Sequence, residues 1–211
     1  FLLAGSALAI SVPLGVVMGV TAAAHPRSLI DRIVTVLSLA GVSIVQFWLG
    51  LMLIVLFAVT LGWLPTGGVG EPQHVILPAL TLAARPIGRI AQVTRSAMLD
   101  ELAKPYVITA RAKGVGEFQV IYLHTLKNAA IPIVTMVGDE TSALLTGAIL
   151  VEKVFAWPGI GLLIIDSLSR SDLPIIQASI AVVATLVILV NLLVDLSYCF
   201  FKPDIQLGRG R

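Results

Sequence analysis

The chain has 211 residues, of which 57% are hydrophobic and only 12% are charged, and its formal net charge is +2. Soluble globular domains carry about a quarter charged residues, so the composition excludes that class and predicts an integral membrane protein. The small net charge gives no nucleic-acid-binding footprint. Cys199 is the only cysteine, which excludes an intrachain disulfide. The three histidines are far apart, so no metal or cofactor site is expected.

Long apolar runs predict an all-α, polytopic transmembrane bundle that forms a single domain over residues 1–211. A spanning helix needs about 20 mostly apolar residues, and five runs meet this length. Because the chain begins with Phe1 and continues at once into an apolar run, we expect a further N-terminal region to precede it. The predicted spans cover residues 2–24, 33–61, 75–97, 129–150 and 174–201.

Three local patterns refine this picture, in chain order. Gly15 and Gly19 form a GxxxG pattern in the first span, which indicates close packing against another helix. The glycines and prolines of residues 62–72 predict an irregular loop between the second and third spans. After the fourth span, a turn at Pro158-Gly159 should lead into a short amphipathic helix on the outer surface.

The basic residues of the connecting loops are distributed unevenly. Loop 25–32, the region 98–128 and the C-terminal tail carry most of the lysines and arginines outside the spans, whereas loop 62–74 carries none. Cytoplasmic loops of membrane proteins are enriched in lysine and arginine. This distribution predicts that loop 25–32, the region 98–128 and the C-terminus face the cytoplasm.

Residues 100–127 are too polar to span a membrane and too regular for a disordered loop. Apolar residues such as Val107, Phe118 and Ile121 recur at roughly helical spacing between charged residues. Gly114 and Gly116 allow the helix to end or to turn. The pattern predicts a short amphipathic helix, a turn and a continuation into the next span. From periodicity alone, a helix that rests on lipid headgroups fits equally well.

The sequence of this segment resembles a known family. "YVITARAKGVGEFQVIYLHTLKNAAIPIV" (106–134) resembles the EAA loop of bacterial ATP-binding-cassette (ABC) importer permeases, in the form found in the peptide and nickel subfamily. Ile108-Thr109-Ala110 stands where the general loop has Glu-Ala-Ala, and Gly114 follows at the expected place. The general loop's final proline is replaced by Lys127. Three further segments are similar to that subfamily: residues 47–68, 151–161 and 191–205.

The resemblance implies a MetI-like fold with six spans in the full subunit, of which five are present here. It implies a bacterial inner-membrane permease subunit that imports peptides, nickel or a related small solute by alternating access. The expected partners are a homologous second permease, two cytoplasmic ABC ATPase subunits, an extracytoplasmic solute-binding protein and the lipid bilayer. The chain has no G-x-x-x-x-G-K-[ST] loop, so we expect no catalytic residues here and ATP hydrolysis in a separate subunit.

In such permeases the EAA loop forms a coupling helix that docks on the ATPase and transmits its movement to the spans. Arg111 and Lys113 are expected to pair with acidic groups of the partner or with lipid phosphates. Gly114 is expected to let the backbone turn. The residues that the resemblance assigns to ATPase coupling are Thr109, Ala110, Arg111, Lys113, Gly114, Gly116 and Glu117.

Four ionisable residues fall near the centres of predicted spans. Arg85 and Arg89 lie four residues apart, on one face of the third span, with Pro86 between them to kink or loosen the helix. Asp139 and Glu140 lie in the fourth span. Four unpaired charges would cost on the order of 10 kcal/mol on insertion scales. We therefore expect the acidic pair to approach the arginine pair at the wall of a transport path. A purely structural ion pair is the alternative.

Two further alternatives remain open. Intramembrane acids and arginines would also suit a stand-alone secondary transporter driven by an ion gradient, although no inverted repeat is visible. Glu152 and Trp157, in the outer segment, either help to receive substrate from a binding protein or pack a surface helix. Asn191 and Asp195, in the last span, indicate a helix-packing or interfacial polar contact, with a place on the transport path as the alternative for Asp195.

Overall fold

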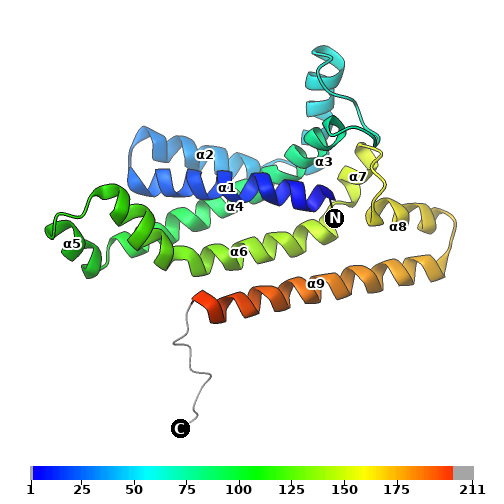
Figure 1. The fold of residues 1–211 in the computed structure, drawn as a ribbon. Helices are drawn as coiled ribbons and strands as arrows, with labels where there is room; N and C mark the ends of the chain where they lie inside the picture. Colours follow the sequence, from blue (N-terminus) through cyan, green and yellow to red (C-terminus); the bar gives the residue numbers. More distant parts are fainter. Residues whose placement is uncertain (1, 202–211) are drawn as a thin grey trace, which may run out of the picture.

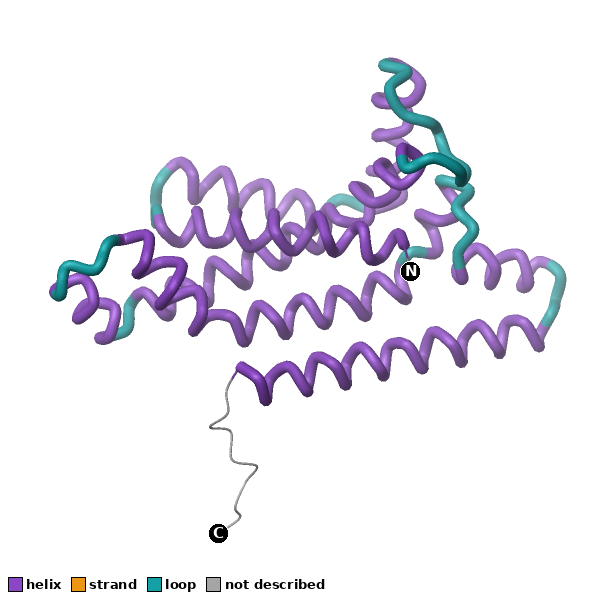
Figure 2. Tube along the Cα trace, in the orientation of Figure 1, coloured by secondary structure: helices purple, strands orange, loops and turns teal. Residues whose placement is uncertain are grey.

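The computed structural model describes residues 2–201, and its long helices run side by side (Figure 1). Within that range the regular structure is entirely helical, with helices joined by loops (Figure 2). The predicted all-α class is therefore confirmed. In chain order, the α-helices and the two π-helices η1 and η2 are α1 (Leu2–Ala24), α2 (Leu29–Ser43), α3 (Gln46–Leu53), η1 (Ile54–Thr60), α4 (Gln73–Leu102), α5 (Pro105–Ala112), η2 (Gln119–Thr125), α6 (Leu126–Gly147), α7 (Ile149–Val154), α8 (Ile160–Ser169) and α9 (Leu173–Phe201).

The two ends of the bundle differ in what they carry. The α1–α2 turn, α5 and the C-terminal end of α9 lie at one end, which we call the α5 end (Figure 1). Helices α3, α7 and α8, together with η1, lie at the opposite end, which we call the α8 end. The tail that was predicted to be cytoplasmic, residues 202–211, lies outside the described residues.

Most predicted span boundaries agree with the helices to within a few residues. Helices α1 and α9 coincide with the predicted spans 2–24 and 174–201. The predicted span 129–150 is displaced, because α6 continues directly from η2 and ends at Gly147. Helix α4 is longer than predicted and runs through its two internal prolines, so Pro86 does not interrupt it.

The predicted span 33–61 is wrong as a single helix. Helix α2 ends at Ser43, and the backbones of Ile44 and Val45 are extended. The next helical stretch, α3 with η1, is bent from α2 by 102°. The break lies at two apolar residues and no proline marks it. Neither hydropathy nor a helix-breaking residue therefore indicated it.

Packing on both sides of the bend accounts for it. Helix α2 lies against α4, where Gly88 brings the two backbones together next to the carbonyl group of Ser38. Helix α3 contacts α4 and α7, and Gly50 lies beside the ring of Phe155. Both halves contact α4, but only α3 also reaches α7, so one straight helix would lose one set of contacts.

Three unbroken helical stretches of the described residues are long and apolar enough to cross a membrane: Leu2–Ala24, Gln119–Gly147 and Leu173–Val194. The bent pair of α2 with α3 and η1 would make a fourth. Helix α4 does not meet this criterion, but its 30 residues would extend about 45 Å. The number of five spans therefore stays a prediction, because α4 is not among these candidate spans.

Helix α4 is the central packing element, since it contacts α1, α2, α3 and α6. The GxxxG prediction for α1 is confirmed at this contact. A Cβ atom added to Gly15 would lie 2.8 Å from the Cβ of Ile90, and one added to Gly19 would lie 2.5 Å from the Cβ of Thr94. Only glycine allows the two backbones to come so close.

Two apolar clusters fill the bundle, one toward each end. The cluster of the α5 end consists of Val20, Ala23, Met98, Ala129 and Ile133. The cluster of the α8 end consists of Leu3, Ala4, Ala7, Leu77, Leu82, Ala83, Leu144, Ala148, Val151 and Phe155. The irregular loop predicted over 62–72 is confirmed, and it is anchored to the second cluster by a hydrogen bond from Gly68 N–H to the Phe155 carbonyl oxygen (2.9 Å).

Candidate functional site

The segment from α5 to η2 projects at the α5 end of the bundle (Figure 1). Lys104 is the N-cap of α5, and Pro105 occupies the first helical position, where its fixed φ and missing N–H are tolerated. The Val107 side chain is fully buried, whereas Ile108, beside it, is 63% exposed. Helix α5 is therefore anchored by Val107 and exposes Ile108, in agreement with the predicted amphipathic pattern.

Gly114 ends α5 in a Schellman motif. Its φ is +79°, in the left-handed region that glycine occupies without steric cost. Val115 N–H donates to the Ala110 carbonyl oxygen at 3.2 Å, and Gly114 N–H donates to the Arg111 carbonyl oxygen at 2.9 Å. Gly116 does not have a positive φ. Of the two predicted turn glycines, Gly114 alone meets a conformational requirement.

A salt bridge closes the turn after α5. Arg111 Nε donates to Glu117 Oε1 at 2.8 Å, and Arg111 Nη2 donates to Glu117 Oε2 at 3.2 Å. Bidentate pairing of this kind fixes geometry as well as charge. Arg111 was expected to pair with a partner or with lipid, but in this structure it pairs within the chain. Lys113 is exposed beside it.

The π-helix η2 connects the turn to the bundle through buried contacts. Val120 is fully buried, and the Thr125 hydroxyl donates to the Val120 carbonyl oxygen at 2.8 Å, closing the wide turn. Ile121 packs against the cluster of the α5 end. Phe118, just before η2, is 73% exposed. The element thus combines a fixed base with an exposed apolar side chain and a salt bridge.

Of the remaining predicted coupling residues, Thr109 and Ala110 lie on α5, and Glu117 lies after its turn. The Thr109 hydroxyl donates to the Pro105 carbonyl oxygen at 3.0 Å, within the helix. Ala110 is half-buried, and Glu117 is exposed. The structure therefore brings all seven predicted residues onto one projecting helix and its turn.

A polar network at the base of α5 was not predicted. The Tyr106 hydroxyl donates to Glu101 Oε2 at 2.9 Å and accepts from Asn128 Nδ2 at 3.1 Å. Lys104 Nζ pairs with Glu101 Oε1, and this hydrogen bond raises the pKa of Lys104. Desolvation raises the pKa of the Tyr106 phenol, so this hydroxyl keeps its proton at neutral pH. The spacing of Glu101 and Lys104 could have indicated their pair, but nothing local indicates Asn128.

A second unpredicted linkage joins α2 to α4. The Asp31 carboxylate, 5% exposed, receives hydrogen bonds from Nε and Nη2 of Arg95, the latter at 2.8 Å. Arg27 N–H also donates to Asp31, at 2.9 Å, and Ser28 caps the helix by accepting from Asp31 N–H at 3.2 Å. The Ser-x-x-Asp spacing indicates the cap, but not the distant arginine. This pair holds the α1–α2 turn on α4 at the α5 end.

The acidic pair was expected to approach the arginine pair, and one residue of each pair forms a salt bridge. Arg89 Nη1 lies 2.9 Å from Glu140 Oε1, joining α4 to α6. Glu140 is 2% exposed, and its Oε1 has no aligned hydrogen bond among the described residues. Arg85 and Asp139 are exposed and have no ion pair within residues 2–201. The structure therefore brings together two of the four predicted residues, Arg89 and Glu140.

At the α8 end, Glu152 caps α8. Its Oε2 accepts from Leu162 N–H at 3.0 Å, at the positive end of the helix dipole. Gly159 and Gly161 leave room for this carboxylate, because a Cβ atom at either position would collide with it. This contact supports the packing alternative for Glu152. Asn191 likewise has a packing contact, since it accepts from the Ser142 hydroxyl at 3.0 Å between α9 and α6. The side chain of Asp195 lies outside the described residues.

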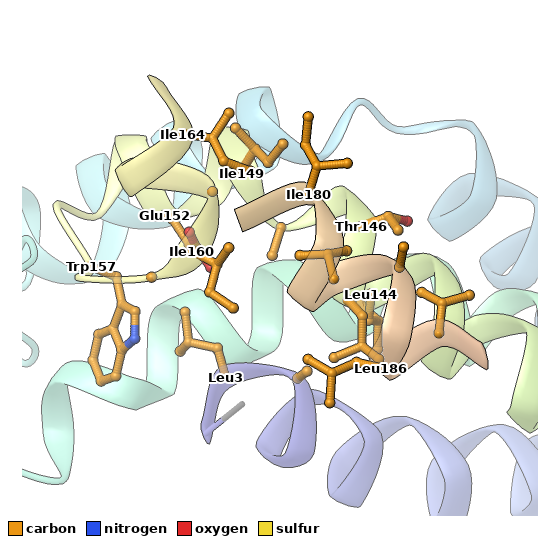
Figure 3. A pocket seen from close by; sticks show the side chains of 18 of the residues that line it. Leu3, Leu144, Thr146, Ile149, Glu152, Trp157, Ile160, Ile164, Ile180 and Leu186 are labelled. Carbon is orange, nitrogen blue, oxygen red and sulfur yellow. The ribbon is translucent and has the colours of Figure 1, made fainter. Parts of the chain in front are cut away.

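A cavity of about 520 Å³ lies beside Glu152 (Figure 3). Apolar side chains of α1, α6, α8 and α9 line most of it, including Leu3, Leu144, Ile160 and Leu186. Its one carboxylate already accepts the α8 N–H group. The cavity can hold an apolar group, and the side chains of Glu152 and Thr146 in its lining form hydrogen bonds within the chain.

Comparisons with known proteins agree with this picture. Residues 12–207 match the family described as binding-protein-dependent transport system inner membrane component. The chain is 43% identical to the di/tripeptide transport system permease protein DppB of Pseudomonas aeruginosa (strain UCBPP-PA14), over 91% of this chain and 66% of that protein. It is 45% identical to the glutathione transport system permease protein GsiC of Escherichia coli (strain K12), over 91% and 63%. The chain thus spans just under two thirds of the length of these relatives.

A solved structure shares the fold. The structure described as inward facing conformations of the MetNI methionine ABC transporter superposes with a TM-score of 0.72 and 18% identity, covering 95% of this chain and 90% of that chain. At this identity the likeness shows the fold alone, and the predicted MetI-like fold is confirmed. The family match over most of the sequence carries the assignment: this chain belongs to the binding-protein-dependent transport system inner membrane components.

Proposed function

We propose that this chain is the permease subunit of an ATP-driven importer for peptides in the bacterial inner membrane. The observation that carries the proposal is the projecting element of α5, the Gly114 turn and η2, which is fixed to the bundle at both ends and exposes Phe118 and Ile108. A force applied to such an element is passed to α4 and α6 instead of being lost in a flexible loop. The subunit carries no catalytic chemistry of its own.

The proposed docking partner of this element is a cytoplasmic ATPase subunit. Phe118 and Ile108 provide apolar anchors, and Lys113 provides a positive charge for acidic groups of the partner. The Arg111–Glu117 salt bridge keeps the turn in one shape. Thr109, Ala110 and Gly116 lie on the same helix and turn, and Gly114 sets the direction of the backbone there. This arrangement needs the α5 end to face the cytoplasm, in agreement with its basic loops.

The remaining partners follow from the family. Two ATPase subunits, a homologous second permease and an extracytoplasmic solute-binding protein complete the proposed complex. Arg85 and Asp139, exposed and without an ion pair in the described range, are proposed to face the path between the permeases. Arg89 and Glu140 are proposed to form its wall. The C-terminus is proposed to be cytoplasmic.

Peptides are the proposed cargo class. One similar relative is named as a di/tripeptide permease and another as a glutathione permease, and both names denote short peptides. Neither name supports nickel, the other cargo that the sequence resemblance implies. The family match also gives no support to a stand-alone ion-coupled transporter.

Cross-linking tests the docking proposal. Single cysteines at positions 111, 113, 117 and 118 of the complete subunit, co-expressed with its ATPase, are expected to form cross-links to the ATPase that change on ATP binding. A cysteine at Trp63, in the loop at the α8 end, is the matched control and should form none. Absence of ATPase cross-links from all four positions, with the control labelled equally well, would refute the docking surface.

A further inference from the structure

The base of α5 contains a linkage that the proposed docking surface does not use. Helix α4 ends at Leu102 and α5 begins at Pro105, so two residues join them. On the other side, η2 runs directly into α6. The Tyr106 hydroxyl lies where the three helices meet, donating to Glu101 of α4 and accepting from Asn128 of α6.

The two partners of Tyr106 are themselves held in place. Glu101 also pairs with Lys104, the N-cap of α5. Asn128 Nδ2 also donates to the His124 carbonyl oxygen, at 2.9 Å, within the segment where η2 becomes α6. A continuous path of hydrogen bonds therefore runs from the end of α4, through one hydroxyl of α5, to the beginning of α6.

We propose that Tyr106 is a positioning residue whose hydroxyl makes α4 and α6 move together with α5. The proposal rests on the proposed coupling function of α5. Without this hydroxyl, α5 stays attached through its buried Val107 side chain and through the chain itself. Apolar contacts hold a helix in place but have little directionality. Without the hydroxyl, α5 could therefore tilt against its base without moving α4 and α6.

The position of the network argues against a role in stability alone. Tyr106 and Asn128 are exposed, and so is the Lys104 side chain, at 52%. Exposed ion pairs and single exposed hydrogen bonds contribute little to stability. Removing one hydroxyl here should leave the fold intact, so an effect on transport can be separated from misfolding.

The test measures peptide uptake per ATP hydrolysed by the complete importer in proteoliposomes, with peptide-loaded binding protein outside. For Tyr106→Phe we expect this ratio to fall about fivefold, the effect of losing one hydrogen bond from the coupling energy. ATP hydrolysis without cargo and the thermal unfolding temperature should not change. A merely structural role would lower the amount of folded complex but not the ratio.

Tyr122→Phe is the matched control, since the Tyr122 hydroxyl has no hydrogen-bond partner among residues 2–201. This variant should keep the wild-type ratio. Asn128→Ala removes the other side of the linkage and should reproduce the effect of Tyr106→Phe. The double variant should fall no further than either single variant, because one linkage is lost in all three.

Phe118→Ala distinguishes this inference from the docking proposal. If Tyr106→Phe keeps the wild-type ratio while Phe118→Ala lowers it, the coupling role of α5 stands and the role of Tyr106 is refuted. If neither substitution lowers the ratio, docking through this surface is refuted as well, and with it the basis of the inference. Additive effects of Tyr106→Phe and Asn128→Ala would also refute a shared linkage.

Discussion

At the scale of single residues, helical geometry decides which charges of α4 and α6 meet. Successive residues of an α-helix are about 100° apart around its axis, so Asp139 and Glu140 cannot both face α4. Glu140 faces it and pairs with Arg89, whereas Asp139 is exposed. Arg85 shares a helix face with Arg89 in the sequence pattern, but it has no acidic residue within reach in the described range.

The first prediction concerns this ion pair. Arg89→Gln leaves the buried Glu140 carboxylate without a counter-charge, and we expect it to lower the free energy of unfolding by about 3–5 kcal/mol. Arg85→Gln is the control. Because Arg85 is exposed and unpaired in the described structure, its loss should change stability by no more than about 0.5 kcal/mol. Thermal unfolding of the detergent-solubilised complex measures both effects.

The exchanged pair Arg89→Glu with Glu140→Arg separates structure from transport. It should recover most of the stability lost in the single variants, because opposite charges again meet. If these residues form the wall of the path, peptide uptake or peptide preference should change in the exchanged pair. If the exchanged pair instead recovers stability, peptide uptake and peptide preference in full, Arg89 and Glu140 form only a structural link between α4 and α6.

At the scale of elements, the turn after α5 depends on one glycine. The φ of Gly114 is +79°, and an added Cβ atom would meet nothing within 4 Å. The requirement is therefore conformational and not steric. Gly116 has equally open surroundings but no positive φ. The two glycines look equivalent in the sequence, but only Gly114 has a backbone conformation that favours glycine.

The second prediction follows from this difference. Gly114→Ala forces a residue with a Cβ atom into the left-handed region, at a cost of about 1–2 kcal/mol. We expect the turn to distort and peptide uptake to fall about fivefold, the population change that such an energy produces. Gly116→Ala should transport like the wild type. Equal uptake by the two alanine variants in proteoliposomes would contradict this account of the turn.

At the scale of the whole molecule, the two ends of the bundle carry different structural features. The α5 end carries the projecting element, the Asp31–Arg95 bridge and the Tyr106 network. The α8 end carries the bent α3, the loop that is anchored to Phe155, and the capped helix α8. Helix α4, packed between α1, α2 and α6, connects the two ends.

The third prediction concerns the source of energy. In proteoliposomes that contain the complete importer, peptide uptake should require ATP on the side of the ATPase subunits. A protonophore should leave its rate unchanged, because the proposed power stroke enters through α5 and not through the membrane charges. Uptake that persists without ATP and stops with the protonophore would favour the ion-coupled alternative. A complex with ATPase subunits unable to hydrolyse ATP is the control.

The sequence by itself determined the membrane class, the helical fold, the approximate positions of α1, α6 and α9, and the turn at Gly114. These features depend on local properties: the length of an apolar run, the preference of glycine for a positive φ, and helical spacing. For the same reason the GxxxG pattern of α1 predicted close packing without identifying its partner, α4.

Only the tertiary structure decided the bend after Ser43, the choice of Glu140 over Asp139, and the unpredicted polar links. Asp31 and Arg95 are 64 residues apart in the chain, and Tyr106 and Asn128 are 22 apart. Each of these features depends on how neighbouring helices are rotated and how closely they pack. Hydropathy and spacing describe one helix at a time, and therefore do not determine which side chains two helices bring into contact.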